Sequence, residues 1–120
     1  MPYLLLILEA RGQRAGRQPA EAARLYDAMM AFGAELDRRG LLLRAESLRT
    51  DEHAVRVSVA APGREPQTLD GPFAETKEMV GGFFLIDVAT RAEALTIARR
   101  CPAVNWATVE VRECAPCHVP

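Results

Sequence analysis

The chain has 120 residues, 49% of them hydrophobic, and its 15 basic residues nearly balance 16 acidic ones. This length suits one compact domain with a hydrophobic core, because a second domain would be too small to stand alone. The near-neutral charge, without blocks of like charges, excludes an electrostatic footprint for nucleic acid. The first apolar run is too short to cross a bilayer and follows no basic segment, so we expect a cytoplasmic protein without a membrane partner.

The N-terminal half predicts a strand, a helix and two further strands. Residues 3–8 form a continuous apolar run, which is typical of a strand buried on both faces. A helix is predicted from Pro19, where apolar residues recur every three or four positions, to Gly40, which suits a left-handed C-terminal residue. Residues 41–48 begin the next strand, and the alternation of valines in 54–59 predicts another.

The C-terminal half repeats this alternation of strand and helix. Residues 67–69 form a short extended piece before a Gly-Pro turn, and residues 80–88 predict a strand that is apolar on both faces. The Gly-Gly pair near its start indicates close backbone approach or a bulge. Residues 90–93 have capping-box spacing and begin a helix that Pro102 ends, and residues 107–112 alternate as a last strand.

This element order predicts an α+β sandwich of ferredoxin-like type, with two helices on one face of a mixed, mainly antiparallel sheet. We assign residues 1–113 to the domain and 114–120 to a tail. Two helices cover only one face of such a sheet, yet two of its strands are apolar on both faces. We therefore expect a homodimer in which the sheets pack against each other.

Four stretches together resemble the YCII-related family, in particular its DGPF-motif branch. They are the apolar start at 1–7, DGPFAETKE at 70–78, GGF at 81–83 and VEVR at 109–112. The resemblance covers essentially the whole chain. It implies a ferredoxin-like fold that dimerises into an α/β barrel, a scaffold shared with small lyases, isomerases and monooxygenases of aromatic metabolism.

The resemblance implies no established activity. Some relatives lie beside, or are fused to, extracytoplasmic-function sigma factors, which implies a regulatory alternative. The wider group includes a dehydrochlorinase-like activity for which a His and Asp pair is the proposed site. The histidines of this chain are His53 and His118. The position before Pro102, at which an Asp occurs in relatives, is Cys101 here, so the chain departs from that pattern.

The DGPF segment gathers the residues we regard as catalytic candidates: Asp70, Glu75, Lys77 and Glu78. If this segment folds over a barrel mouth, a carboxylate could act as general base while the lysine stabilises an enolate-like charge. The alternative is that Asp70 caps the turn through its own backbone and the other three are solvated loop charges.

A second group could bind the substrate: Tyr3, Phe73, Phe83 and Arg112. The aromatic rings could line an apolar pocket for a flat molecule, and the arginine lies on a strand face that could point into a dimer barrel. Core packing explains the rings equally well, and an exposed sheet edge explains the arginine.

The tail contains Cys114, Cys117 and His118 in a C-x-x-C-H pattern. We reject covalent haem, since no export signal or haem fold accompanies it. Zinc binding by two thiolates and an imidazole is an alternative to a frayed tail with incidental cysteines, and we expect neither metal nor cofactor. Cys101 fits a small buried apolar residue rather than a nucleophile.

The sequence thus favours a cofactor-free lyase or isomerase acting on a small molecule in a dimeric α/β-barrel pocket. The alternative is a non-catalytic regulatory or interaction module associated with a sigma factor or another transcription regulator. A metal sensor that uses the tail cysteines is a third hypothesis. The substrate and the reaction do not follow from these residues.

Overall fold

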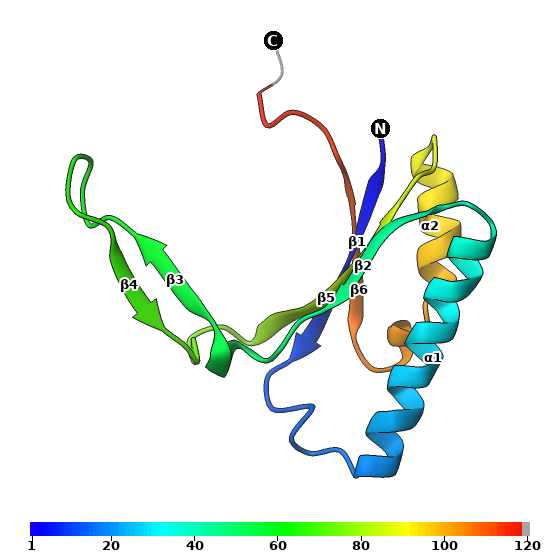
Figure 1. Ribbon diagram of the computed structural model, residues 1–120, viewed down its shortest axis with the longest axis horizontal. Coiled ribbons are helices and arrows are strands. Elements are labelled where there is room, and N and C mark those ends of the chain that lie inside the picture. Colours follow the sequence, from blue (N-terminus) through cyan, green and yellow to red (C-terminus); the bar gives the residue numbers. More distant parts are fainter. Residues whose placement is uncertain (119–120) are drawn as a thin grey trace.

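The computed structural model describes residues 1–118 and has an α+β architecture. Two helices cover one face of a four-stranded sheet, and a two-stranded ribbon, here called the arm, projects on the other side (Figure 1). Within the described residues, no helix combines the length and apolar character needed to cross a membrane. The elements are β1 (Tyr3–Ala10), α1 (Pro19–Arg38), β2 (Leu42–Ser47), η1 (Asp51–His53), β3 (Val55–Ser58), β4 (Gln67–Asp70), β5 (Glu78–Ile86), α2 (Arg91–Arg100), η2 (Pro102–Asn105) and β6 (Thr108–Glu113).

The sheet has the strand order β2-β5-β1-β6, and every neighbouring pair is antiparallel. Without the arm, the chain follows the β-α-β-β-α-β connectivity. The predicted α+β class and the two helices on one face are confirmed. The third predicted strand does not join this sheet, because β3 pairs only with β4, with Val55 opposite Asp70. The alternating valines indicate that one face of the strand is apolar, but they do not indicate whether the strand pairs within the main sheet or outside it.

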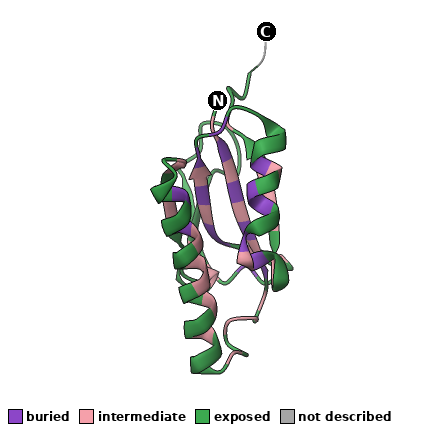
Figure 2. Ribbon diagram, turned by 90° about the vertical axis from the view of Figure 1, so that its right-hand side faces the viewer, coloured by how far each residue is buried: buried purple, intermediate pink, exposed green. Residues whose placement is uncertain are grey.

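Strand β1 is central and apolar on both faces, as predicted. Its residues alternate between buried positions facing the helices, such as Leu5 and Ile7, and half-buried positions facing away (Figure 2). Burial of the helix-facing row contributes to the hydrophobic stabilisation of the fold. On that side Leu36 of α1 and Ile97 of α2 complete the core, and the rings of Phe32 and Phe84 meet edge to face with centroids 5.1 Å apart.

Strand β5 contains the bulge that the Gly-Gly pair indicated. Ile7 lies opposite Gly82, but the next residue, Leu8, lies opposite Val80, so Gly81 is the extra residue. A bulge changes the face on which the following residues lie. Val80 consequently shares a face with Phe83, whereas strict alternation would place it with Gly82.

The face of the sheet away from the helices, here called the open face, has an apolar centre and charged margins. Its centre comprises Leu4, Leu6 and Leu8 of β1 with Val80, Phe83 and Leu85 of β5. Register places Arg44 and Glu46 of β2 on one margin and Glu110 and Arg112 of β6 on the other. Neither helix of the described residues covers this face, because both lie on the opposite side of the sheet (Figure 1).

Candidate functional site

Two clefts border the sheet. The arm-base cleft has a volume of about 530 Å³. It lies where η1, the start of β5 and the loop of residues 71–77 between β4 and β5, here called the DGPF loop, meet. The helix cleft has a volume of about 930 Å³ and lies between α1 and strands β2 and β5. Arg49 and Leu48 line both, so the two clefts adjoin at the end of β2.

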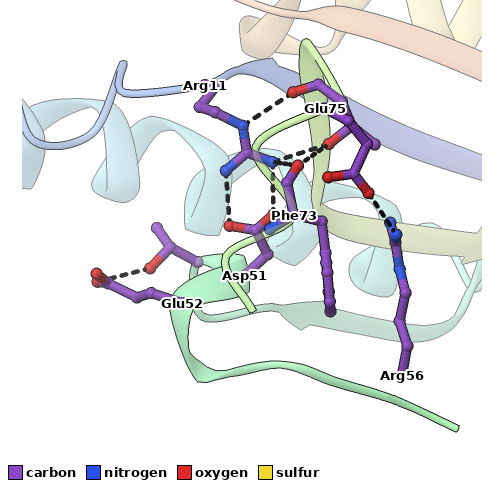
Figure 3. Close-up of polar contacts among 8 residues, drawn as sticks. Arg11, Asp51, Glu52, Arg56, Phe73 and Glu75 are labelled. Carbon is purple, nitrogen blue, oxygen red and sulfur yellow. Dashed lines mark hydrogen bonds and ion pairs between the residues drawn. The ribbon is translucent and has the colours of Figure 1, made fainter. Parts of the chain in front are cut away.

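A cluster of polar contacts, here called the clasp, fixes the DGPF loop to the body (Figure 3). Arg11 donates from Nη1 and Nη2 to the two carboxylate oxygens of Asp51, at 2.8 and 2.5 Å. The same guanidinium donates to the carbonyls of Phe73 and Thr76, both at 2.9 Å. The Phe73 backbone N–H donates to Asp51 at 3.1 Å. Three segments far apart in sequence therefore meet at one bidentate ion pair.

The clasp sets the electrostatics of this region. Hydrogen bonding from Arg11, supported by the Phe73 N–H, lowers the pKa of Asp51 from 3.8 to about 2. The reciprocal bond from Asp51 raises the pKa of Arg11. Glu75 has a lowered pKa, caused first by its own backbone N–H and then by Arg56, whose Nη1 lies 2.9 Å from its carboxylate. Both carboxylates are therefore anionic at neutral pH.

Asp51→Asn is expected to lower stability at neutral pH, with a deficit that shrinks under acid. Because folding depresses the pKa of Asp51, its contribution is complete above about pH 4 and disappears as pH falls towards its folded pKa of about 2. Urea unfolding between pH 5 and pH 2 measures this. Asp70→Asn removes an exposed carboxylate outside the clasp and is the matched control. A deficit that stays constant down to pH 2 would contradict the assignment.

The structure distributes the four catalytic candidates over separate positions. Glu78 lines the arm-base cleft. Glu75 pairs with Arg56, which lies 3.7 Å above the Phe73 ring. Asp70 ends β4 in the exposed arm, and Lys77 is exposed, its carbonyl accepting from the Arg11 backbone N–H at 3.0 Å. Of these four, the arm-base cleft includes Glu78 alone.

The four predicted substrate-binding residues also lie apart. Tyr3 is buried in the core at the start of β1, and Phe73 lines the arm-base cleft. Phe83 lies opposite Leu6 on the open face and also borders the helix cleft. Arg112 lies on the open face, 3.3 Å from Glu110. The single chain therefore does not assemble them into one pocket.

His53 belongs to η1 and lines the arm-base cleft. Its Nε2 lies 3.2 Å from Nη2 of Arg49. Asp51 is two residues away, but its carboxylate accepts from Arg11 and the Phe73 N–H rather than from the imidazole. His53 and Asp51 therefore do not form a hydrogen-bonded His and Asp pair in this turn.

Sequence analysis missed Glu9, which is only 4% exposed and is the buried charged residue of the described chain. It continues the helix-facing row of β1 and pairs with Arg14, whose Nε donates to it at 3.1 Å. Arg14 also donates to the carbonyls of Gly81, at 3.0 Å, and Leu48, at 2.7 Å. A Cβ atom on Gly81 would overlap the Glu9 carboxylate. The Gly-Gly pair, which leaves room for this carboxylate, was the available signal.

Glu9 lies at the polar end of the helix cleft. Arg14 and Arg17 lie at the same end, and an apolar wall continues along α1. That wall includes Leu25, Tyr26, Met29, Met30, Phe84 and Trp106. An apolar cleft with a few convergent polar groups is the usual form of a small-molecule site. A carboxylate at its floor can accept a proton from a bound molecule.

The cysteines provide no cluster of metal ligands within residues 1–118, where no three His, Cys, Asp or Glu side chains come together. Cys101 is buried, and burial raises the pKa of its thiol. Its Sγ lies 4.0 Å from Sδ of Met29. Cys114 is half-buried and Cys117 exposed, while positions 119–120 of the predicted tail lie outside the described residues.

Comparison with known proteins identifies the family of this chain. By its fold, the protein belongs to the α+β class, with two helices on one face of an antiparallel sheet. The YCII-related domain matches residues 1–117, and the chain belongs to this family. It is similar to an uncharacterised protein of Rhizobium meliloti (strain 1021), with 51% identity over 53 residues. That match covers 42% of this chain and 43% of the relative, so it spans less than half of either.

Proposed function

We propose that this protein is a cofactor-free enzyme of the lyase or isomerase type, which moves a proton on a small molecule bound in the helix cleft. The observation that carries the proposal is Glu9, a carboxylate only 4% exposed, at the polar end of a cleft of about 930 Å³. In this proposal Glu9 is the proton acceptor. Burying a charged residue destabilises the fold unless the charge is paired. A buried carboxylate that borders a cleft is therefore a candidate for a catalytic role.

The surroundings of Glu9 support this role. Arg14 holds the carboxylate in one orientation and is itself fixed by the carbonyls of Gly81 and Leu48. The apolar wall along α1 would exclude water from a bound molecule, which strengthens electrostatic interactions there. Such a site suits abstraction of a proton next to a carbonyl group. Glu78, one of the four catalytic candidates, remains a proposed contributor from the adjoining arm-base cleft.

Hydrogen–deuterium exchange at carbon tests the proposal without knowledge of the product. The wild-type protein is incubated in D₂O with a panel of aromatic and aliphatic 2-keto acids, and NMR follows deuterium entering at the carbon next to the keto group. We expect catalysed exchange for at least one acid, reduced about 100-fold or more in Glu9→Gln. Glu9→Asp keeps the carboxylate and is expected to retain part of the rate.

Glu21→Gln removes an exposed carboxylate from the first turn of α1 and is the matched control. Its exchange rate should equal that of the wild type. Equal rates in Glu9→Gln and the wild type would exclude Glu9 as the base. No exchange with any member of the panel would count against the proton-transfer proposal itself.

The alternative function is a non-catalytic module that acts with a sigma factor or another transcription regulator. The observation in its favour is the arm, where Val57 is 66% and Leu69 59% exposed without a core beneath them. It predicts that a purified extracytoplasmic-function sigma factor binds the wild type in calorimetry and that Val57→Lys abolishes this binding. Absence of binding by the wild type would exclude that partner.

We also propose that the open face forms a homodimer. Its apolar centre and its two charged margins, Arg44 with Glu46 and Arg112 with Glu110, are self-complementary for two copies packed face to face. Leu6→Lys is expected to convert the dimer into monomers, because it places a charge in the apolar centre. Analytical ultracentrifugation measures the mass against the 13.2 kDa of one chain.

Val104→Lys is the control for this prediction, since Val104 is exposed in η2 away from the open face. It should leave the dimer intact. A wild type that sediments as a monomer at micromolar concentration would overturn the dimer proposal.

A further inference from the structure

The arginines of the helix cleft differ in their partners. Arg14 is neutralised by Glu9. Arg17 and Arg49 also line the cleft, yet within residues 1–118 neither has a carboxylate within ion-pair distance. Two cations beside an apolar wall form a site that an anionic group would complete.

Neutral contacts hold these cations at the cleft. Arg17 donates from Nη2 to Oε1 of Gln13 at 3.0 Å, and Gln13 donates from Nε2 to the carbonyl of Trp106 at 2.5 Å. Arg49 lies 3.2 Å from the His53 imidazole. Neither contact neutralises a guanidinium, so both retain their charge for a ligand.

The acidic residues of the cleft do not cancel this charge. Glu46 accepts from Nε of Arg44 at 2.7 Å. Asp37 lies in the last turn of α1, 18 residues after Pro19, which is roughly 27 Å along the helix axis. The cleft is therefore cationic at the N-terminal end of α1 and apolar along its length.

The apolar wall also carries side chains that a ligand would cover. Tyr26 and Met30 line the cleft yet are 54% and 57% exposed. Leu25 and Met29 beside them are only half-buried. Large apolar side chains exposed together beside a cleft are typical of a binding surface.

We propose that the helix cleft binds an amphipathic organic acid, with its carboxylate between Arg17 and Arg49 and its hydrocarbon or aromatic body along α1. This inference rests on the cleft of the proposed function and names the substrate class for it. The reacting carbon would be close to the carboxylate, at the end of the cleft where Glu9 lies.

Trp106 makes this binding measurable, because it is the single tryptophan of the chain and it lines the cleft. The probe is 2-bromoundecanoate, an acid whose bromine lies next to the carboxylate and quenches tryptophan fluorescence on contact, used below its micellar concentration. We expect saturable quenching in the wild type. The uncharged amide of the same chain should bind about tenfold more weakly, since it lacks the charge-assisted bonds.

The double variant Arg17→Gln/Arg49→Gln should weaken binding of the acid about tenfold and leave binding of the amide unchanged. Arg24→Gln/Arg64→Gln removes two exposed arginines outside the cleft and should bind like the wild type. Met30→Glu, which adds a negative charge along the wall, should also weaken binding of the acid. Circular dichroism confirms that each variant is folded.

Quenching without saturation, or equal affinity in the wild type and the Arg17→Gln/Arg49→Gln variant, would overturn the inference. The two proposals fail separately. Saturable binding of the acid without any carbon exchange would leave this inference standing and remove the enzymatic proposal. Exchange on keto acids without binding of the bromo acid would do the reverse.

Discussion

Gly71→Ala is expected to destabilise the fold by about 3 kcal/mol and to release the DGPF loop from the body. A Cβ atom at this position would overlap the carbonyl oxygen of Asp51 and approach that of Ala54 to 3.3 Å. These are backbone atoms, so no side-chain rotation relieves the overlap. The Gly71 N–H also donates to the Ala54 carbonyl at 2.8 Å, so displacement would break a hydrogen bond as well.

Urea denaturation measures this loss, and amide hydrogen exchange localises it to the arm and the clasp. Gly16→Ala is the matched control, because a Cβ atom there would make only ordinary contacts, the nearest at 3.7 Å from the Gln13 carbonyl. Its effect should be within about 0.5 kcal/mol of zero. If Gly71→Ala were equally mild, the loop would not be held as the clasp geometry indicates.

Arg14→Ala is expected to lower the free energy of unfolding by about 3 to 5 kcal/mol, because it leaves Glu9 buried without a partner. The loss includes the hydrogen bonds that Arg14 donates to Leu48 and Gly81, which join the ends of β2 and β5 to the loop after β1. Chemical denaturation at pH 7 is the measurement.

Two comparisons separate burial from simple loss of an ion pair. Replacing both partners, in Glu9→Met/Arg14→Met, should recover most of the stability, since no unpaired charge is then buried. Arg38→Ala breaks an exposed pair with Glu35 and should cost no more than about 1 kcal/mol. A double variant less stable than Arg14→Ala would show that the pair contributes more than mutual neutralisation.

Local patterns predicted most elements of the fold. The apolar run of β1, the periodicity of α1 and the capping residue Thr90, which accepts the Glu93 N–H at 3.2 Å, each depend on neighbours in sequence. Gly40 has a φ of 71°, as expected for a left-handed residue after a helix. The pairing partner of β3 could not be predicted, because a strand has the same alternation of apolar and polar residues whether it joins the sheet or projects from it.

The candidate site was harder to predict because its residues meet only in three dimensions. Asp51 lies between two predicted strands, where no local pattern distinguishes it, yet it is the partner of Arg11, 40 residues earlier. Glu9 follows the apolar run of residues 3–8, and its burial depends on the absence of a side chain at Gly81. The DGPF segment was singled out for its catalytic candidates, whereas in the structure its Phe73 backbone takes part in the clasp and its Gly71 N–H donates to the Ala54 carbonyl.

The arm has a consequence for how this protein opens. Its two strands are joined to each other by backbone hydrogen bonds, and each of their residues is exposed. A two-stranded ribbon without buried side chains is marginal by itself in water. The arm therefore forms a separate cooperative unit whose opening is governed by the clasp and not by the core. Amides of β3 and β4 should exchange with solvent long before those of β1, and cleavage by a protease should begin at the breaker-rich tip, residues 61–66.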